Sequence, residues 1–250
     1  MRKDILIGIA ATAAAITGAL AARAAEIVVN PPAEGLANDA LAAALAKASP
    51  GDRVVLRAGE YRLGGPVTFP RGGEPGRPIT VCAAPGEYVA LLGSVRPAGW
   101  EKHTGNIWEV KHPPKHVKGL YEDSERLTHP RPDWGKREDP PLSELKTPGT
   151  WTQDDDWVYV WCRESDTPDN HRIEASQNHV LNVSRPWIRV ERLHMFFGQN
   201  VVCEITADHC EVVACEIAHC SNSVDNSYNA YFSGCSYSAF RNCRMHDSFY

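Results

Sequence analysis

The sequence predicts an all-β protein folded as a right-handed parallel β-helix, a solenoid that begins with an N-terminal capping helix. The main observation is a five-position register that recurs in residues 188–195, 210–217 and 238–245, with offsets of 22 and 28 residues. A period near 22 with tolerated insertions is typical of a solenoid whose units bury their apolar faces against each other. The second observation is the alternation of apolar residues inside each unit.

This alternation changes phase once in every repeat, at Arg192, Ala214 and Asn242. Alternation indicates a strand with one buried face, and a phase change at a fixed place indicates a bend between two strands. A helical solenoid would instead require apolar residues three and four positions apart. We therefore expect short parallel strands, with equivalent residues of successive coils about 4.8 Å apart.

Composition supports one turn-rich domain, since the 250 residues include 19 Gly and 18 Pro and are 43% hydrophobic. We divide it into the cap and first coils (25–92), a Trp-rich insertion (93–176) and regular coils (177–250). The sequence ends directly after a core-facing coil with no polar cap, which predicts that it is the front part of a longer protein.

Residues 1–24 have the features of a secretory signal peptide. Arg2 and Lys3 precede an apolar run at 5–20, and the sequence of residues 22–24 is a small-residue cleavage site. We expect export to the periplasm or the medium, with no stable membrane insertion after cleavage. Cleavage would change the net charge from −5 to −7, which argues against a nucleic-acid partner.

The first elements after the signal are a helix and three strands. Residues 36–48 predict a short amphipathic helix that covers the open end of the solenoid. Residues 53–56, 79–81 and 88–92 are strand-like and are separated by Gly- and Pro-rich turns, so they should form the first coils.

Two stretches resemble a known group of proteins. Residues 50–87, PGDRVVLRAGEYRLGGPVTFPRGGEPGRPITVCAAPGE, resemble the N-terminal coils of secreted right-handed parallel β-helix proteins of the pectate lyase-like superfamily. Residues 157–176, WVYVWCRESDTPDNHRIEAS, resemble uncharacterised bacterial relatives of these proteins. The resemblance is to the branch with alginate lyases and chondroitinase B. It implies the fold, and it leaves the reaction open because lyases, hydrolases and binding proteins share this scaffold.

The insertion contains six of the seven tryptophans and an acidic run at 154–156. Exposed indoles beside charged groups bind sugar rings, so Trp134 and Trp151 are candidate substrate-binding residues. The alternative is that these tryptophans pack the insertion onto the coils.

Catalytic candidates come from the register, in which His219 and Asp247 are equivalent positions of successive coils. A carboxylate stacked beside an imidazole would raise its basicity. Arg244 and His246 should point outward beside them, where Arg244 would bind the carboxylate of an acidic sugar and His246 would contact substrate. The alternative for all of them is solvated surface.

A calcium site is also possible. The insertion between Cys220 and Cys235 supplies Asn222, Asp225 and Asn226, whose oxygens suit Ca²⁺, although Asn and Asp also serve as ordinary turn residues. Six of the eight cysteines fall in the repeats, where we expect unbonded thiols in the core, with a Cys215–Cys243 disulfide as the alternative.

These features predict a secreted protein that acts on polysaccharide. We expect a lyase that cleaves a uronate-containing polysaccharide by β-elimination; the alternatives are a glycoside hydrolase and a non-catalytic glycan-binding module. In the lyases that the chain resembles, a lysine and an arginine move the proton and calcium neutralises the uronate. No lysine follows Lys146, so a histidine would have to be the base, or the base lies beyond residue 250.

Overall fold

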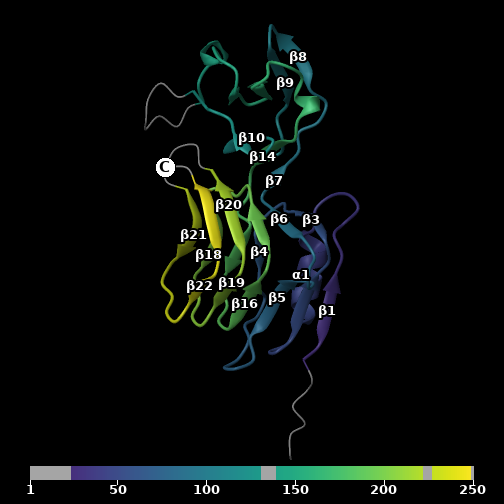
Figure 1. The fold of residues 1–250 in the computed structure, drawn as a ribbon, viewed down its shortest axis with the longest axis vertical. Helices are drawn as coiled ribbons and strands as arrows, with labels where there is room; N and C mark the ends of the chain where they lie inside the picture. Colours follow the sequence, from purple (N-terminus) through teal and green to yellow (C-terminus); the bar gives the residue numbers. More distant parts are fainter. Residues whose placement is uncertain (1–23, 131–138, 222–226, 249–250) are drawn as a thin grey trace, which may run out of the picture.

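The computed structural model of the protein describes residues 24–130, 139–221 and 227–248. Three parallel sheets form the walls of a β-helix, and an antiparallel insertion stands on one edge of it (Figure 1). The fold class predicted from the sequence, an all-β parallel β-helix, is confirmed.

The first sheet has six parallel strands. They are, in spatial order, β1 (Glu26–Val29), β2 (Arg53–Leu56), β5 (Ile79–Ala83), β16 (Ile188–Glu191), β19 (Glu211–Val213) and β22 (Ala239–Arg241). Val190 pairs with Val212 and Val212 pairs with Phe240, so the offsets of 22 and 28 residues read from the sequence are the register of the sheet.

The second sheet follows the bend after the first. Its strands are β3 (Gly59–Arg62), β6 (Val89–Leu92), β17 (His194–Phe196), β20 (Glu216–Cys220) and β23 (Arg244–Ser248). Arg192, Ala214 and Asn242 separate the two sheets and have φ of 55°, 51° and 52°. At each predicted change of phase, therefore, one residue in the left-handed backbone conformation turns the chain, and the apolar side chains on both sides of it stay inside.

The third sheet completes each coil. Its strands are β4 (Val67–Thr68), β15 (Leu181–Val183), β18 (Val201–Ile205) and β21 (Tyr228–Phe232). Inward side chains of the three sheets form one continuous core, which includes Leu91, Met195, Ile217 and the thiol of Cys215.

The predicted helix is α1 (Asn38–Lys47), which is shorter than the 36–48 expected. Leu41, Ala44 and Leu45 are its buried face, and they join the core of the solenoid at the end where β1 and β2 lie. No helix among the described residues is long and apolar enough to cross a membrane.

The insertion leaves the second coil after β6 and returns before β15. Its two ends meet at Gly93, whose oxygen accepts the backbone N–H groups of Gln177 and Asn178. A Cβ at position 93 would lie 2.4 Å from the oxygen of Asn178, so only glycine fits this junction.

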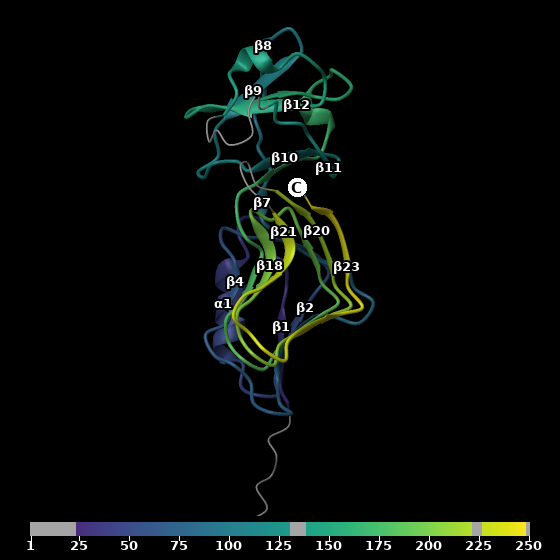
Figure 2. The same ribbon diagram turned by 90° about the vertical axis from the view of Figure 1, so that its left-hand side faces the viewer.

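The described residues of the insertion form two antiparallel sheets and two short 3₁₀ helices. One sheet consists of β7 (Ser94–Val95), β14 (Ile173–Ser176), β10 (Gly119–Glu122) and β11 (Glu125–Arg126); the other consists of β8 (Glu101–Thr104), β9 (Ile107–Lys111), β13 (Trp157–Trp161) and β12 (Thr150–Gln153). The 3₁₀ helices are η1 (Leu142–Glu144) and η2 (Pro168–Asn170). The insertion has its own apolar core, and it places β10 beside one end of β20 (Figure 2).

Candidate active site

The outer face of the second sheet carries a cluster of ionisable side chains at its end near the insertion. Register alone aligns His194, Glu216 and Arg244 across β17, β20 and β23, and it aligns Ala218 with His246. We call the following set the histidine face: His194, Glu216, His219, Arg244, His246 and Asp247.

Glu216 is the centre of this face. One carboxylate oxygen, Oε2, lies 2.8 Å from Nδ1 of His194. The other, Oε1, lies 2.9 Å from Nε2 of His246 and 3.2 Å from Nη1 of Arg244. Burial disfavours the charged carboxylate, but these contacts outweigh it and lower the pKa of Glu216. Glu216 therefore holds three cationic or cation-forming side chains in place.

Asp247 connects the two histidines that stand closest together. Its Oδ2 is 2.7 Å from Nδ1 of His246 and 3.7 Å from Nδ1 of His219. His219 and Asp247 have φ of 58° and 54°, as does Phe197 at 57° in the preceding coil. These equivalent residues form a second left-handed corner of the solenoid, and this corner aligns the imidazole and the carboxylate as the register predicted.

Aromatic side chains surround His219. Its ring stacks on Phe197 at 4.9 Å and meets the edge of Tyr121, which comes from β10 of the insertion, at 5.6 Å. The His246 ring lies 5.7 Å away and nearly perpendicular. The insertion thus covers His219, whose side chain is 11% exposed against 28% for His246.

The pKa values of the two imidazoles, those of His219 and His246, are shifted in opposite directions. Burial, partly offset by Asp247, lowers the pKa of His219. Burial also acts against charge on His246, but hydrogen bonds with Asp247 and Glu216 outweigh it and raise its pKa. These opposite shifts favour the neutral form of His219 and the protonated form of His246, as a paired base and acid require.

Trp151, which the sequence predicted to bind substrate, does not reach this face. Trp151 is 1% exposed inside the core of the insertion, with its ring 4.5 Å from His129, so no indole face is open to a sugar. Trp151 packs, as the alternative expected, but it packs within the insertion and not between the insertion and the coils. Trp134 and the predicted calcium ligands Asn222, Asp225 and Asn226 lie outside the described residues.

One group of metal-ligating type occurs among the described residues. Atoms of Glu122, Asp123 and His171 lie within 4.8 Å of one another on the insertion. Both ring nitrogens of His171 already contact carboxylates, Nδ1 that of Asp123 at 2.8 Å and Nε2 that of Asp166 at 2.7 Å. This geometry is that of an imidazolium held between carboxylates.

Sequence reasoning missed Glu216, His194 and Tyr88. The same offsets that aligned His219 with Asp247 also align His194, Glu216 and Arg244, so the signal was present. The Tyr88 ring lies 4.4 Å from that of His194 and is half-exposed, which extends the face toward β3. No repeat position pointed to Tyr88.

No family model and no curated protein matches the sequence. Among solved structures, the chain is similar to XylC in complex with xylose, with a TM-score of 0.56 and 15% identity over 78% of this chain and 41% of that one. A glycoside hydrolase matches with a TM-score of 0.61 and 11% identity, over 90% of this chain and 73% of the other. The likeness is one of fold.

A third match, the pectate lyase Pel9A, has a TM-score of 0.37 and 11% identity and covers 84% of this chain. This chain spans 41% of the XylC chain and 47% of the Pel9A chain. At these identities the likeness to XylC and to the glycoside hydrolase shows the fold alone.

Proposed function

We propose that the protein is a secreted carbohydrate-active enzyme that cleaves a uronate-containing polysaccharide by β-elimination on the histidine face. The observation that carries the proposal is that His219 and His246 share Asp247 while their pKa values are shifted apart. A lyase needs such a pair, one group to take a proton and one to return it.

Each residue then has a defined role. Neutral His219 takes the proton from the carbon next to the uronate carboxylate. The electron pair of the broken C–H bond then forms the new double bond as the bond to the leaving oxygen breaks. His246, protonated between Glu216 and Asp247, gives one of its two ring protons to the leaving oxygen as the hydrogen bond that holds this proton opens. Arg244, with a side chain that is 75% exposed, binds the uronate carboxylate and makes the α-proton more acidic.

The names of the fold neighbours support a carbohydrate substrate, since one is a glycoside hydrolase and another was determined with xylose. They do not distinguish among sugars. The acidic sugar is proposed from Arg244, and the calcium ion considered for residues 222–226 remains a proposal for those residues.

A panel of alginate, polygalacturonate, hyaluronan and chondroitin tests the reaction. Elimination creates a conjugated double bond, so we expect a rise in ultraviolet absorbance together with new reducing ends on at least one polymer. His246→Gln and Asp247→Asn should abolish most of this signal. The matched control is His103→Gln, since His103 also pairs with a carboxylate, Glu109, but on the insertion. Unchanged activity in both site variants would reject the assignment.

Glycosidic hydrolysis is the second candidate, and it is favoured by the carboxylates of Glu216 and Asp247 on either side of His246. A hydrolase directs two carboxyl groups at one glycosidic bond. Here an imidazole occupies the space between them, which favours elimination. New reducing ends without ultraviolet absorbance would reverse this preference, and binding without new ends would indicate a glycan-binding module.

Export is also proposed, on the signal-like residues 1–24. N-terminal sequencing of protein recovered from the periplasm or medium should begin at Ala25. Recovery of the full-length N-terminus from the cytoplasm would reject export.

A further inference from the structure

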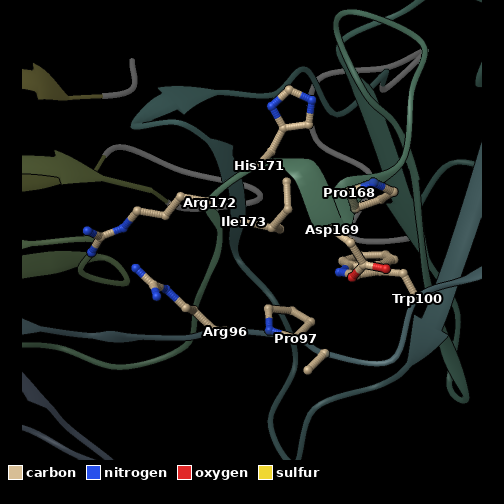
Figure 3. Close-up of a pocket in the computed structure, with 9 residues that line it drawn as sticks. Arg96, Pro97, Trp100, Pro168, Asp169, His171, Arg172 and Ile173 are labelled. Carbon is tan, nitrogen blue, oxygen red and sulfur yellow. The ribbon is translucent and has the colours of Figure 1, made fainter.

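A pocket in the insertion lies apart from the histidine face. It is formed by the segment between β7 and β8, which contributes Arg96, Pro97 and Trp100, and by the segment that leads into β14, which contributes Asp169 and Arg172 (Figure 3). Its volume is about 250 Å³. Figure 3 shows the guanidinium groups of Arg96 and Arg172 side by side at one end, with Trp100 and Asp169 at the other.

A buried carboxylate fixes both arginines. Oε1 of Glu174 accepts hydrogen bonds from Nε of Arg172 at 2.9 Å and from Nε of Arg96 at 3.2 Å. Glu174 also binds Arg62 with both oxygens, at 2.7 and 2.9 Å, and accepts the hydroxyl of Ser94. Because the Glu174 side chain is fully buried, these contacts are shielded from water and hold the arginines in position.

Each arginine keeps a terminal nitrogen for a ligand. The shortest ion-pair contacts are made by Nε and Nη2 of Arg96 and by Nε and Nη1 of Arg172. Within the described part of the chain, the side-chain hydrogen bonds of both arginines are donated by Nε, and none is donated by Nη1 of Arg96 or Nη2 of Arg172. Both side chains are partly exposed, so a solvent-borne group can reach these nitrogens.

The local charge favours an anion. Three guanidinium groups, those of Arg62, Arg96 and Arg172, meet two carboxylates, those of Glu174 and Glu60. One positive charge is left over at this end of the pocket, and guanidinium groups bind carboxylates through paired, charge-assisted hydrogen bonds.

The remaining walls suit a sugar ring. Pro97 and the buried side chains of Pro168, Ile173 and Trp100 line the rest of the pocket, and the carboxylate of Asp169 is an acceptor for hydroxyl groups. A ligand with a carboxylate at one end, an apolar ring face and hydroxyls at the other is a uronic acid. We propose that this pocket binds a uronate unit of the polysaccharide.

The pocket also adjoins the proposed active face. Nη1 of Arg172 lies 2.8 Å from Oε1 of Glu60 on β3. Across the second sheet, Glu60 pairs with Ala90, and Ala90 pairs in turn with His194. The same register continues from His194 to Glu216 on the histidine face. This inference rests on the proposed function for the saccharide nature of the ligand, and it adds a second contact point that selects acidic units.

The test measures binding without turnover. Glucuronate, galacturonate and mannuronate are titrated into the whole protein by isotope-edited NMR or calorimetry, each against its neutral partner glucose, galactose or mannose. We expect at least one acid to bind more tightly than its partner, and Arg96→Gln to weaken that acid about tenfold while leaving the neutral sugar unchanged. Arg96→Lys, which keeps the charge, should recover part of the loss.

Lys102→Gln is the matched control, because Lys102 is a cation of the same insertion that lies over Trp108. It should leave all affinities unchanged. The pocket proposal is overturned if no uronate binds better than its neutral partner, or if Arg96→Gln binds it equally well. The outcome is separate from catalysis, since uronate binding with no lyase activity would reject the proposed reaction and keep the pocket.

Discussion

The hydroxyl of Tyr121 on β10 donates a hydrogen bond of 2.8 Å to the backbone oxygen of His219 on β20. This bond joins the insertion to the solenoid beside the proposed base, and it is buried. The same tyrosine ring packs on Phe197 at 5.0 Å. Tyr121 therefore contributes both to the docking of the insertion and to the placement of His219.

Tyr121→Phe keeps the ring and removes this hydrogen bond. Because the oxygen of His219 would be left buried without that donor, we expect a loss of about 1–3 kcal/mol in the free energy of unfolding, measured with urea. Tyr159→Phe is the control, since the hydroxyl of Tyr159 binds Asp154, whose carboxylate keeps other donors. Equal effects of the two substitutions would mean that the bond to His219 has no special role.

Glu174→Gln should destabilise the junction more strongly. It removes the buried negative charge that three arginines share, and breaking a buried ion pair from one side costs about 3–5 kcal/mol. Glu101→Gln, on an exposed strand of the insertion, should change stability by less than about 0.5 kcal/mol. Thermal unfolding of both variants checks this, and a Glu174→Gln protein as stable as the control would contradict it.

His171 should make the stability of the folded protein fall as the pH rises. Burial opposes its charge, but Asp123 and Asp166 outweigh burial and raise the pKa of His171 to about 9. An unfolded histidine titrates near about 6.5. Because the folded pKa is the higher one, the stabilisation is fully present below about pH 6.5 and is lost as the pH rises through 9. His171→Gln should flatten the melting temperature over this window, and a variant that keeps the wild-type slope would refute the assignment.

Thiol chemistry offers a separate test. All eight cysteines are free, as expected for thiols in a β-helix core. A hydrogen bond from Cys215 lowers the pKa of Cys243 below that of an ordinary thiol. Alkylation of Cys243, followed by mass spectrometry, should therefore show a pH midpoint below about 8.5, which Cys215→Ala moves up toward that value. Cys235→Ala should leave that midpoint in place. A midpoint already near 8.5 in the wild-type protein would contradict the hydrogen bond.

The solenoid could be predicted because its signal is periodic. Pairing partners stand 22 or 28 residues apart, and the phase changes at Arg192, Ala214 and Asn242 mark the bends. The insertion has no such period. Its strands pair antiparallel across long separations, as β10 does with β14, so its two sheets could not be read from the sequence, and the sequence left open whether Trp151 is buried or binds substrate.

The candidate site divides in the same way. His219 and Asp247 came together because they occupy one register position, and Glu216 was available from the same register. The arginine pocket was not, because Arg62, Arg96 and Glu174 meet only after the insertion folds onto β3. Contacts that depend on an irregular connection leave no spacing in the sequence.

Activity on a cleaved uronate polymer should show a bell-shaped dependence of kcat/KM on pH. Burial lowers the pKa of His219, so its base form is retained to below about pH 6.5. Contacts with Asp247 and Glu216 raise the pKa of His246, so its acid form is retained above that pH. The fall in activity at low pH then reports protonation of the base, His219, and the fall at high pH reports deprotonation of the acid, His246. His246→Gln should remove the basic limb and lower the rate, whereas His103→Gln should preserve both limbs. A basic limb that persists without His246 would assign the acid to another group, and the half-exposed Tyr88 beside His194 is the next side chain to test.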